Sequence, residues 1–346
     1  MSYKIIGDSC TDLPDGVLTD EHFKKIPLII HVGEDTIVDD ETFCQRTLLE
    51  KMKACPQAPK TACPSPADYL ACFGPEGDHY VVTLSGKLSG SYNAAMQARA
   101  IYREEGGRGN VHVFDSRSAS AGQAQIALLI RELASRKLPF AQVVEQVEAY
   151  ISRMQTTFVL ENLDNLAKNG RLTRVQSLVT GALRVKLLMG GTREGEIEKL
   201  GQGLSIRQTL ARMVSRMAEN KDHVGRRLII AHCNCPERAE HVRQLARERC
   251  QFGEILLAAT GGIATVYAND GGVIAAYWSS VVHRAAAAAP PSICIPFRSV
   301  LQWVHHGVIF GKAPPALDGG GGMARHSYER ERRRAPEHPG PGRAGT

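Results

Sequence analysis

The chain has 346 residues, of which 43% are hydrophobic and 23% carry a charge. This balance is close to the average of folded globular proteins, so collagen-like, wholly disordered and coiled-coil classes are excluded, and the length predicts two domains. No apolar run approaches the roughly 18 residues that a membrane helix needs. Lys4 and Asp8 stand where a signal peptide would need an uninterrupted apolar core. We therefore expect a cytoplasmic protein with no integral membrane association.

The formal net charge of +6 is concentrated in the last part of the chain. Residues 278–346 contain eight Arg and one Lys against four acidic residues, whereas residues 1–277 contain 33 basic and 32 acidic residues. The body therefore lacks the basic surface that is typical of nucleic-acid binding, and we expect no nucleic-acid partner.

The segment 278–346 differs from the rest of the chain in composition. Its basic run at 330–334 would suit a nucleic-acid or membrane-surface patch. However, a Pro/Gly-rich segment without periodicity cannot bury enough apolar surface to fold, so we expect most of 278–346 to be disordered. Gly, Ala, Arg and Pro are also encoded by GC-rich codons, and a shifted reading frame after about Tyr277 would give the same composition.

The nine cysteines are odd in number and unevenly spaced, unlike the disulfide framework of a secreted protein. Cys233 and Cys235 are separated by one residue, whereas a structural zinc site typically uses pairs with a longer spacer. We therefore expect reduced thiols and no metal site.

Residues 1–156 alternate between segments typical of strands and segments typical of helices. The expected strands cover residues 4–7, 26–32, 80–84 and 111–114. The expected helices cover residues 47–54, 94–102, 119–135 and 139–154. This alternation predicts an α/β domain with a parallel sheet that helices cover on both faces.

The pattern changes near residue 156, where we place a domain boundary. The expected strands of the second domain cover residues 158–160, 228–231, 255–258 and 273–277, with a hairpin formed by 185–189 and 196–200. The expected helices cover residues 175–183, 205–219 and 236–249, and Asn269-Asp270-Gly271 predicts a second hairpin. These segments predict a second α/β domain over residues 157–277.

Four polar loops share a content of hydroxyl groups and glycines. They cover residues 8–12, 61–66, 85–93 and 115–122, and three of them directly follow an expected strand. Ligands of doubly wound α/β proteins lie beyond the carboxyl ends of the strands, where hydroxyls and backbone N–H groups suit an anion such as a carboxylate or phosphate. Taken singly, such residues are usually helix N-caps, but four loops at one sheet edge predict an anion site.

The same loops do not match a catalytic or nucleotide motif. Gly86 and Gly90 lack the Gly-Lys-Ser/Thr ending of a P-loop, and Ser89 is not flanked as a nucleophile elbow. We therefore expect a binding site without catalytic residues and without a cofactor. The alternative is a small-anion hydrolase or phosphotransferase that uses the same hydroxyl-rich cleft.

Taken together, the loops resemble the DegV family of bacterial fatty-acid-binding proteins, which are subunits of fatty acid kinase. The resemblance covers about residues 3–277. It rests on DSCTDLP at 8–14, Thr61 with PSP at 64–66, LSGSYN at 88–93, Asp115-Ser116, NGR at 169–171, Ile206-Arg207 and TGGI at 260–263.

The resemblance implies a two-domain protein with an apolar tunnel for one long-chain fatty acid, which is a ligand and not a cofactor. It implies that hydroxyls at the mouth bind the carboxylate. The candidate carboxylate-binding residues are Thr61, Ser89, Gly90, Ser91, Asn93 and Arg171. It further implies that a separate ATP-dependent kinase subunit converts the carboxylate to an acyl phosphate.

The resemblance also implies that Arg207 lies on the face that meets this kinase subunit. An isolated arginine such as Arg171 or Arg207 could instead belong to a solvated face. In two positions the chain departs from many relatives: Ala62 stands where they have a serine, and Tyr267 where they have a histidine.

Overall fold

The computed structural model describes residues 2–14, 21–173, 175, 185–219 and 221–279. Its first sheet is parallel, with strand order β2-β1-β6-β7. The strands are β1 (Tyr3–Asp8), β2 (Phe23–Ile26), β6 (Asp78–Thr83) and β7 (Asn110–Asp115). Every residue of β6 is buried, as expected for the interior of a parallel sheet.

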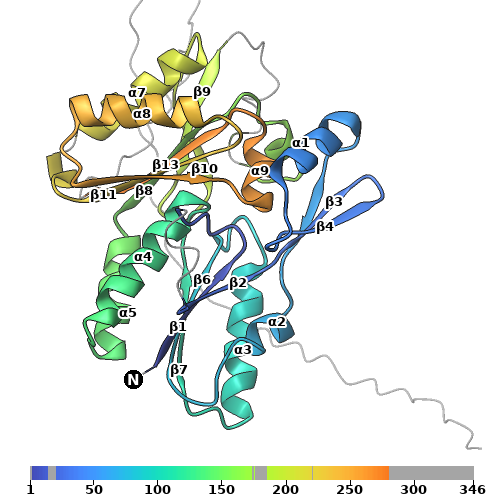
Figure 1. Ribbon diagram of the computed structural model, residues 1–346, viewed down its shortest axis with the longest axis vertical. Coiled ribbons are helices and arrows are strands. Elements are labelled where there is room, and N and C mark those ends of the chain that lie inside the picture. Colours follow the sequence, from blue (N-terminus) through green and yellow to red (C-terminus); the bar gives the residue numbers. More distant parts are fainter. Residues whose placement is uncertain (1, 15–20, 174, 176–184, 220, 280–346) are drawn as a thin grey trace, which may run out of the picture. The chain divides into compact units, whose positions relative to one another are not determined.

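Helices cover both faces of the first sheet (Figure 1). The helices are α2 (Pro66–Leu70), α3 (Ser91–Glu104), α4 (Ala121–Ser135) and α5 (Phe140–Ile151). Successive strand residues point to opposite faces: Ile5 packs in the cluster of α4 and α5, and Ile6 in the cluster of α2 and α3. The expected doubly covered parallel sheet is confirmed.

The second sheet has six strands in the order β10-β9-β8-β13-β11-β12. They are β8 (Met154–Val159), β9 (Lys186–Gly191), β10 (Ile197–Gly203), β11 (Arg227–His232), β12 (Glu254–Ala259) and β13 (Val273–Trp278). Only the β11–β12 pair is parallel in this sheet. Helices α7 (Ile206–Ala218) and α8 (Pro236–Arg249) pack on one face of it through apolar residues such as Leu210, Met213 and Val242.

A third, antiparallel sheet has the order β4-β3-β5, and its Ile30 and Val32 pack in one hydrophobic cluster with Leu48 and Ile263. Its strands are β3 (Ile29–Val32), β4 (Asp35–Val38) and β5 (Lys60–Ala62). The remaining helices of the described residues are α1 (Gln45–Ala54), α6 (Asp164–Lys168), α9 (Gly262–Ala268) and the 3-10 turn η2 (Lys221–His223).

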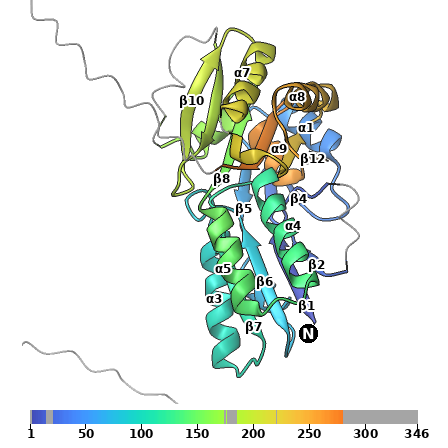
Figure 2. The same cartoon turned by 90° about the vertical axis from the view of Figure 1, so that its left-hand side faces the viewer.

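The carboxyl ends of β1, β6 and β7 point toward the second sheet (Figure 2). The loops that follow these strands contact elements of that sheet directly. Ser85 Oγ donates to Gly195 O at 2.8 Å, and Ser118 Oγ lies 2.6 Å from Thr156 Oγ1. The polar loops found in the sequence are therefore gathered at one junction.

Helix α4 contacts strands of both large sheets. One hydrophobic cluster accordingly joins Ile5 and Tyr80 of the first sheet to Ile229 and Ala276 of the second. A boundary after residue 156 falls inside β8, and the described residues belong to one compact unit that spans 1–290. The limits 1–156 and 157–277 therefore remain our proposal for the two halves.

Most expected elements coincide with observed ones within a few residues, and the β9–β10 hairpin is confirmed. The single strand expected at 26–32 is instead two strands of different sheets, because Pro27 separates β2 from β3 and cannot donate a ladder hydrogen bond. The hairpin expected across 269–271 was wrong: this turn joins α9 to β13. The expected helix at 175–183 lies almost wholly outside the described residues.

Strand β13 runs through Trp278, and Ser279 N donates to Arg153 O at 3.0 Å. The ring of Trp278 also lies 3.6 Å from the Arg226 guanidinium carbon. The first two residues of the segment 278–346 therefore belong to the folded body. Our expectation for 280–346 concerns residues outside those that the structure describes.

Candidate binding site

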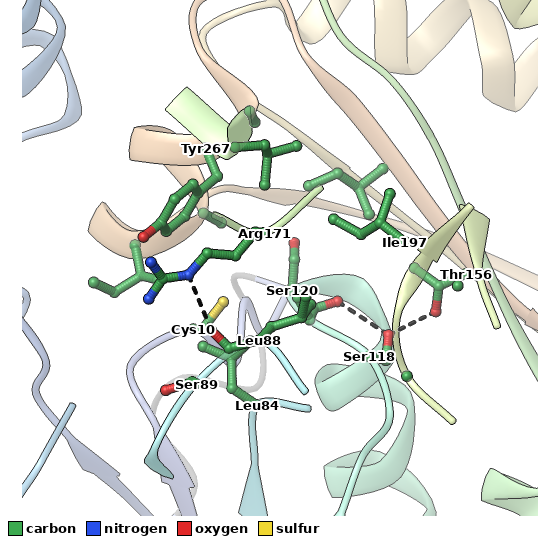
Figure 3. A pocket seen from close by; sticks show the side chains of 18 of the residues that line it. Cys10, Leu84, Leu88, Ser89, Ser118, Ser120, Thr156, Arg171, Ile197 and Tyr267 are labelled. Atoms are coloured by element: carbon green, nitrogen blue, oxygen red, sulfur yellow. Dashed lines mark hydrogen bonds between the residues drawn. The ribbon is translucent and has the colours of Figure 1, made fainter. Parts of the chain in front are cut away.

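A cavity of about 350 Å³ lies between the loops of the first sheet and one face of the second sheet (Figure 3). Its walls are predominantly apolar. The apolar lining residues belong to two hydrophobic clusters: Leu28, Leu84, Ile263 and Ala264 in one, Phe158, Leu160, Leu166, Ile197 and Ile274 in the other, and Leu88 in both. Such a cavity suits an elongated apolar ligand.

Strand β8 gives the cavity wall its regular pattern. Thr156, Phe158 and Leu160 line the cavity, whereas Val159 packs on the opposite face against residues of α7 and α8. This alternation follows from the two-residue period of a strand. Leu160 packs in one cluster with Leu166 and Tyr267, whereas Thr156 lies against Ser118. In Figure 3 Tyr267 and Arg171 lie at the end of the cavity away from Thr156.

Three polar side chains from distant parts of the chain meet at that end, which we call the mouth. Thr61 Oγ1 on β5 lies 2.8 Å from the hydroxyl of Tyr267 on α9. The Arg171 guanidinium carbon lies 5.8 Å from the centre of the Tyr267 ring. Arg171 Nε donates to Leu88 O at 3.1 Å, and its NH1 group donates to Asn169 O. The mouth thus holds two hydroxyls beside one fixed positive charge.

Ser89 supplies a further hydroxyl at the same end. Its Oγ lies 3.0 Å from Ser91 Oγ and accepts a hydrogen bond from Ser91 N at 3.2 Å. A Cβ atom on Gly90 would lie 2.9 Å from Cys63 Sγ, so only glycine lets this loop approach β5 so closely. The loop 89–91 therefore lies close to Cys63, which directly follows β5.

The structure brings four of the six candidate carboxylate-binding residues to the cavity wall: Thr61, Ser89, Gly90 and Arg171. Ser91 is buried behind Ser89, and Asn93 is exposed on α3 and is not among the lining residues. Arg207 is exposed near the start of α7.

The acidic residues of loop 8–12 accept hydrogen bonds from neighbouring loops of the protein itself. Asp12 accepts hydrogen bonds from Ser120 Oγ at 2.5 Å and from Gly261 N at 2.7 Å. Asp8 accepts from Leu84 N at 2.7 Å. Burial raises the pKa of Asp8 to about 6 and that of Asp12 to about 7. These two side chains therefore fix the loops around the cavity, and Cys10 is the residue of loop 8–12 that lines it. A role of this loop in an anion site stays a prediction.

Ser65 likewise has a local role. Its Oγ accepts from Asp68 N at 3.3 Å, and the Asp68 carboxylate accepts from Ser65 N at 2.8 Å. This is a capping box at the start of α2. For Ser65, the ordinary helix-cap interpretation is therefore the right one.

Sequence reasoning did not select several polar residues that line the cavity. Tyr267 was noted only as a departure from relatives, and no motif pointed to Cys10, Ser118 or Thr156 as individual site residues. Cys10 and Ser118 do lie in two of the four polar loops, which was the available signal. Thr156 stands in a strand, and only its sheet neighbours decide that it faces the cavity.

Within the described parts of the chain, no group of three or more His, Cys, Asp or Glu side chains could hold a metal ion. The eight described cysteines form no disulfide bonds with one another. No helix among the described residues has the length and apolar character to cross a membrane.

Fold and cavity together define an α/β protein with an apolar ligand site between two sheets. The family model described as "Uncharacterised protein, DegV family" matches residues 2–279. A DegV domain-containing protein of Streptococcus gordonii is 32% identical over 279 residues, which are 80% of this chain and 99% of the relative. The chain belongs to the DegV family, as the loop motifs indicated.

Two solved structures resemble the chain along nearly their whole lengths. A DegV family protein from Ruminococcus gnavus, refined with vaccenic acid, is 42% identical, with coverage of 80% of this chain and 99% of that one and a TM-score of 0.76. The fatty acid kinase (Fak) B3 protein of Streptococcus pneumoniae, loaded with linoleic acid, is 31% identical, with coverage of 81% and 100% and a TM-score of 0.74.

Proposed function

We propose that this chain binds one long-chain fatty acid in the cavity and presents its carboxylate at the mouth to a separate kinase subunit. The observation that carries this proposal is the arrangement of the cavity: apolar walls that end at a cluster of hydroxyls beside Arg171. A fatty acid has the matching division into a long apolar chain and one charged end.

The apolar walls supply most of the binding free energy. Each CH₂ group that leaves water contributes about 0.8 kcal/mol, so a chain of about 16 carbons gains most when it is enclosed along its length. Phe158, Leu160 and Ile274 on one side and Leu28 and Ile263 on the other provide this enclosure. A small polar substrate would leave these walls unused, which disfavours the alternative of a small-anion hydrolase or phosphotransferase.

The mouth residues offset the cost of removing a carboxylate from water. The hydroxyls of Thr61, Ser89 and Tyr267 can each donate a hydrogen bond to a carboxylate oxygen, and the backbone N–H at Gly90 adds a donor. Arg171 supplies the opposite charge at close range. Ser91 acts through Ser89 by holding its hydroxyl in place.

Two relatives support this ligand class. The Ruminococcus gnavus protein was refined with vaccenic acid, and the Streptococcus pneumoniae protein was loaded with linoleic acid. The second is named as a protein of a fatty acid kinase, which supports a kinase subunit as the partner. This chain would then bind and present the lipid, and the partner would transfer the phosphoryl group.

The partner surface is proposed to include Arg207, whose exposed position on α7 leaves its charge available. We place this activity in the cytoplasm, where ATP is available and where thiols such as those of Cys10 and Cys63 stay reduced.

Organic extraction of the purified protein, followed by mass spectrometry, tests the proposal directly. We expect one fatty acid per chain in the extract, and we expect the Thr61→Val variant to retain less of it. A polar ligand in place of a lipid, or a preparation that takes up no fatty acid when one is supplied, would refute the proposed function.

A further inference from the structure

The end of the cavity away from the mouth carries a second pair of hydroxyl groups. Ser118 Oγ, from the loop after β7, lies 2.6 Å from Thr156 Oγ1 on β8, and both residues line the cavity. In Figure 3 this pair lies across the cavity from Tyr267 and Arg171. The cavity therefore carries a pair of hydroxyl groups at each end, within a lining that is predominantly apolar.

Along β8 the cavity wall changes from apolar to polar in one direction. Leu160 and Phe158 come first from the mouth, and Thr156 follows. Leu160 and Thr156 are four positions apart, which in an extended chain is about 13 Å, because each residue rises about 3.3 Å. An acyl chain with its carboxylate at the mouth would therefore meet these hydroxyls with its distal carbons.

The pair packs closely against Gly122, and the space for a further polar atom lies beside Gly191. A Cβ atom built on Gly191, which lines the cavity here, would have Arg117 O at 3.7 Å as its nearest neighbour. Exposed Arg117 and half-buried Glu196 border the same end. This end is therefore not lined by apolar side chains alone.

On the basis of the proposed function, we infer that Ser118 and Thr156 form a distal subsite for an oxygen-bearing acyl chain, with a hydroxylated fatty acid as the ligand class. When Ser118 donates to Thr156, the Thr156 hydrogen can turn toward the cavity. When Thr156 donates to Ser118, the Ser118 hydrogen is donated to Ala119 O at 3.4 Å, and lone pairs of both oxygens remain to accept. The pair can thus act as donor or acceptor toward a ligand hydroxyl, which has the same two capacities.

Inside the cavity, the presence or absence of a hydrogen-bond partner strongly affects the binding free energy of a hydroxylated acid. A hydroxyl on the ligand that enters an apolar cavity without a partner carries a desolvation penalty, whereas one that meets the pair exchanges a hydrogen bond to water for one to protein. The pair should therefore remove most of the penalty that other apolar tunnels impose on an oxygenated chain.

The test measures displacement of a fluorescent fatty acid by palmitate and by ω-hydroxypalmitate, and by stearate and a mid-chain hydroxystearate. In the native protein we expect at least one hydroxylated acid to bind within about threefold of its parent. In the Ser118→Ala/Thr156→Val double variant we expect that acid to lose about tenfold relative to its parent. The readout is the ratio of the two affinities in each protein, so a change that affects both acids equally does not alter it.

Thr157→Val is the matched control. It makes the same chemical change one residue along β8, where the hydroxyl is buried off the cavity and has no hydrogen-bond partner among the described residues. This variant should keep the native ratio of hydroxylated to parent acid. Equal ratios in the native protein and the double variant would mean that the pair only ties its loop to β8, and would overturn the inference.

A competition measurement on the native protein tests the same inference without the double variant. If the double variant does not fold, the native protein is incubated with an equimolar mixture of stearate and the hydroxystearate, and the bound fraction is analysed by mass spectrometry. Exclusion of the hydroxylated acid from the bound fraction refutes the distal subsite. Failure of both parent acids to bind refutes the proposed function itself, so the two failures are distinguishable.

Discussion

Thr61 and Tyr267 are 206 positions apart in the chain, and their hydroxyl oxygens lie 2.8 Å apart at the mouth of the cavity. One comes from a short edge strand of the third sheet, and the other from α9. Their bond joins two elements that border the mouth. One hydroxyl donates to the other, and both residues line the cavity, so a carboxylate bound there can accept a hydrogen bond from each.

Thr61→Val and Ser89→Ala should each weaken fatty-acid binding without lowering the melting temperature. Each change removes one donor to a charged group, which costs about 1.5–3 kcal/mol or roughly 10–150-fold in affinity. Titration with palmitate measures the change, with exposed Ser135→Ala on α4 as the control for serine and Thr157→Val as the control for threonine. Native affinity in both mouth variants would contradict the head-group assignment.

Tyr267→Phe tests whether Thr61 and Tyr267 act as a unit. The ring and its packing stay, while the hydroxyl is lost, so we expect a loss of about tenfold in affinity. The double variant with Thr61→Val should lose less than the product of the two single losses, because residues that share a hydrogen bond are not independent. Strict additivity in the double-mutant cycle would indicate that the two hydroxyls contribute separately.

The buried Asp12 makes stability depend on pH. Burial raises the pKa of Asp12 from 3.8 to about 7 in the folded protein. The folded protein therefore binds a proton at this carboxyl more strongly than the unfolded chain does. The contribution of Asp12 to the free energy of unfolding is therefore fully present below about pH 4. It is lost as the pH rises to about 7, by at most about 1.4 kcal/mol per pH unit.

Asp12→Asn should reduce this dependence. The native protein should lose stability relative to the variant between pH 5 and pH 8, and urea unfolding at several pH values measures the difference. Parallel curves for the two proteins over this range would show that Asp12 stays ionised in the folded state.

Arg207→Ala should leave lipid binding intact and lower the rate of acyl phosphate formation by the kinase subunit. An exposed charge at a partner surface acts mainly on association, so the loss should shrink at high salt. Arg46→Ala on α1 is a control, since this arginine is also exposed but lies on another element. Loss of bound lipid in Arg207→Ala would contradict this placement.

Truncation after Ser279 should preserve both the melting temperature and the bound fatty acid. Truncation after Tyr277 should lower the melting temperature, because it removes the Trp278 ring from Arg226 and the hydrogen bond from Ser279 to Arg153. Thermal unfolding of the two truncated chains and the full chain makes the comparison. Aggregation of the chain that ends at Ser279 would mean that residues 280–346 complete the core.

The sequence by itself determined the elements that have a clear period and boundary signals. Alternating strands and helices over residues 1–156 predicted the parallel sheet with helices on both faces, and the helix expected at 205–219 is observed as α7. The loop motifs also identified the family and selected four residues that the structure places on the cavity wall. These signals depend on residues close together in the sequence, so they can be recognised without knowledge of the fold.

Only the tertiary structure decided which polar groups face the cavity. Asp12 and Thr61 both stand in hydroxyl-rich or acidic loops, yet Asp12 is taken up by Ser120 and Gly261, while Thr61 remains at the mouth beside Tyr267. Thr156 and Thr157 are adjacent in the same strand and differ only in the face they present. That choice depends on partners far away in the chain, because a buried polar group is placed by the hydrogen bonds and neighbours that its fold provides.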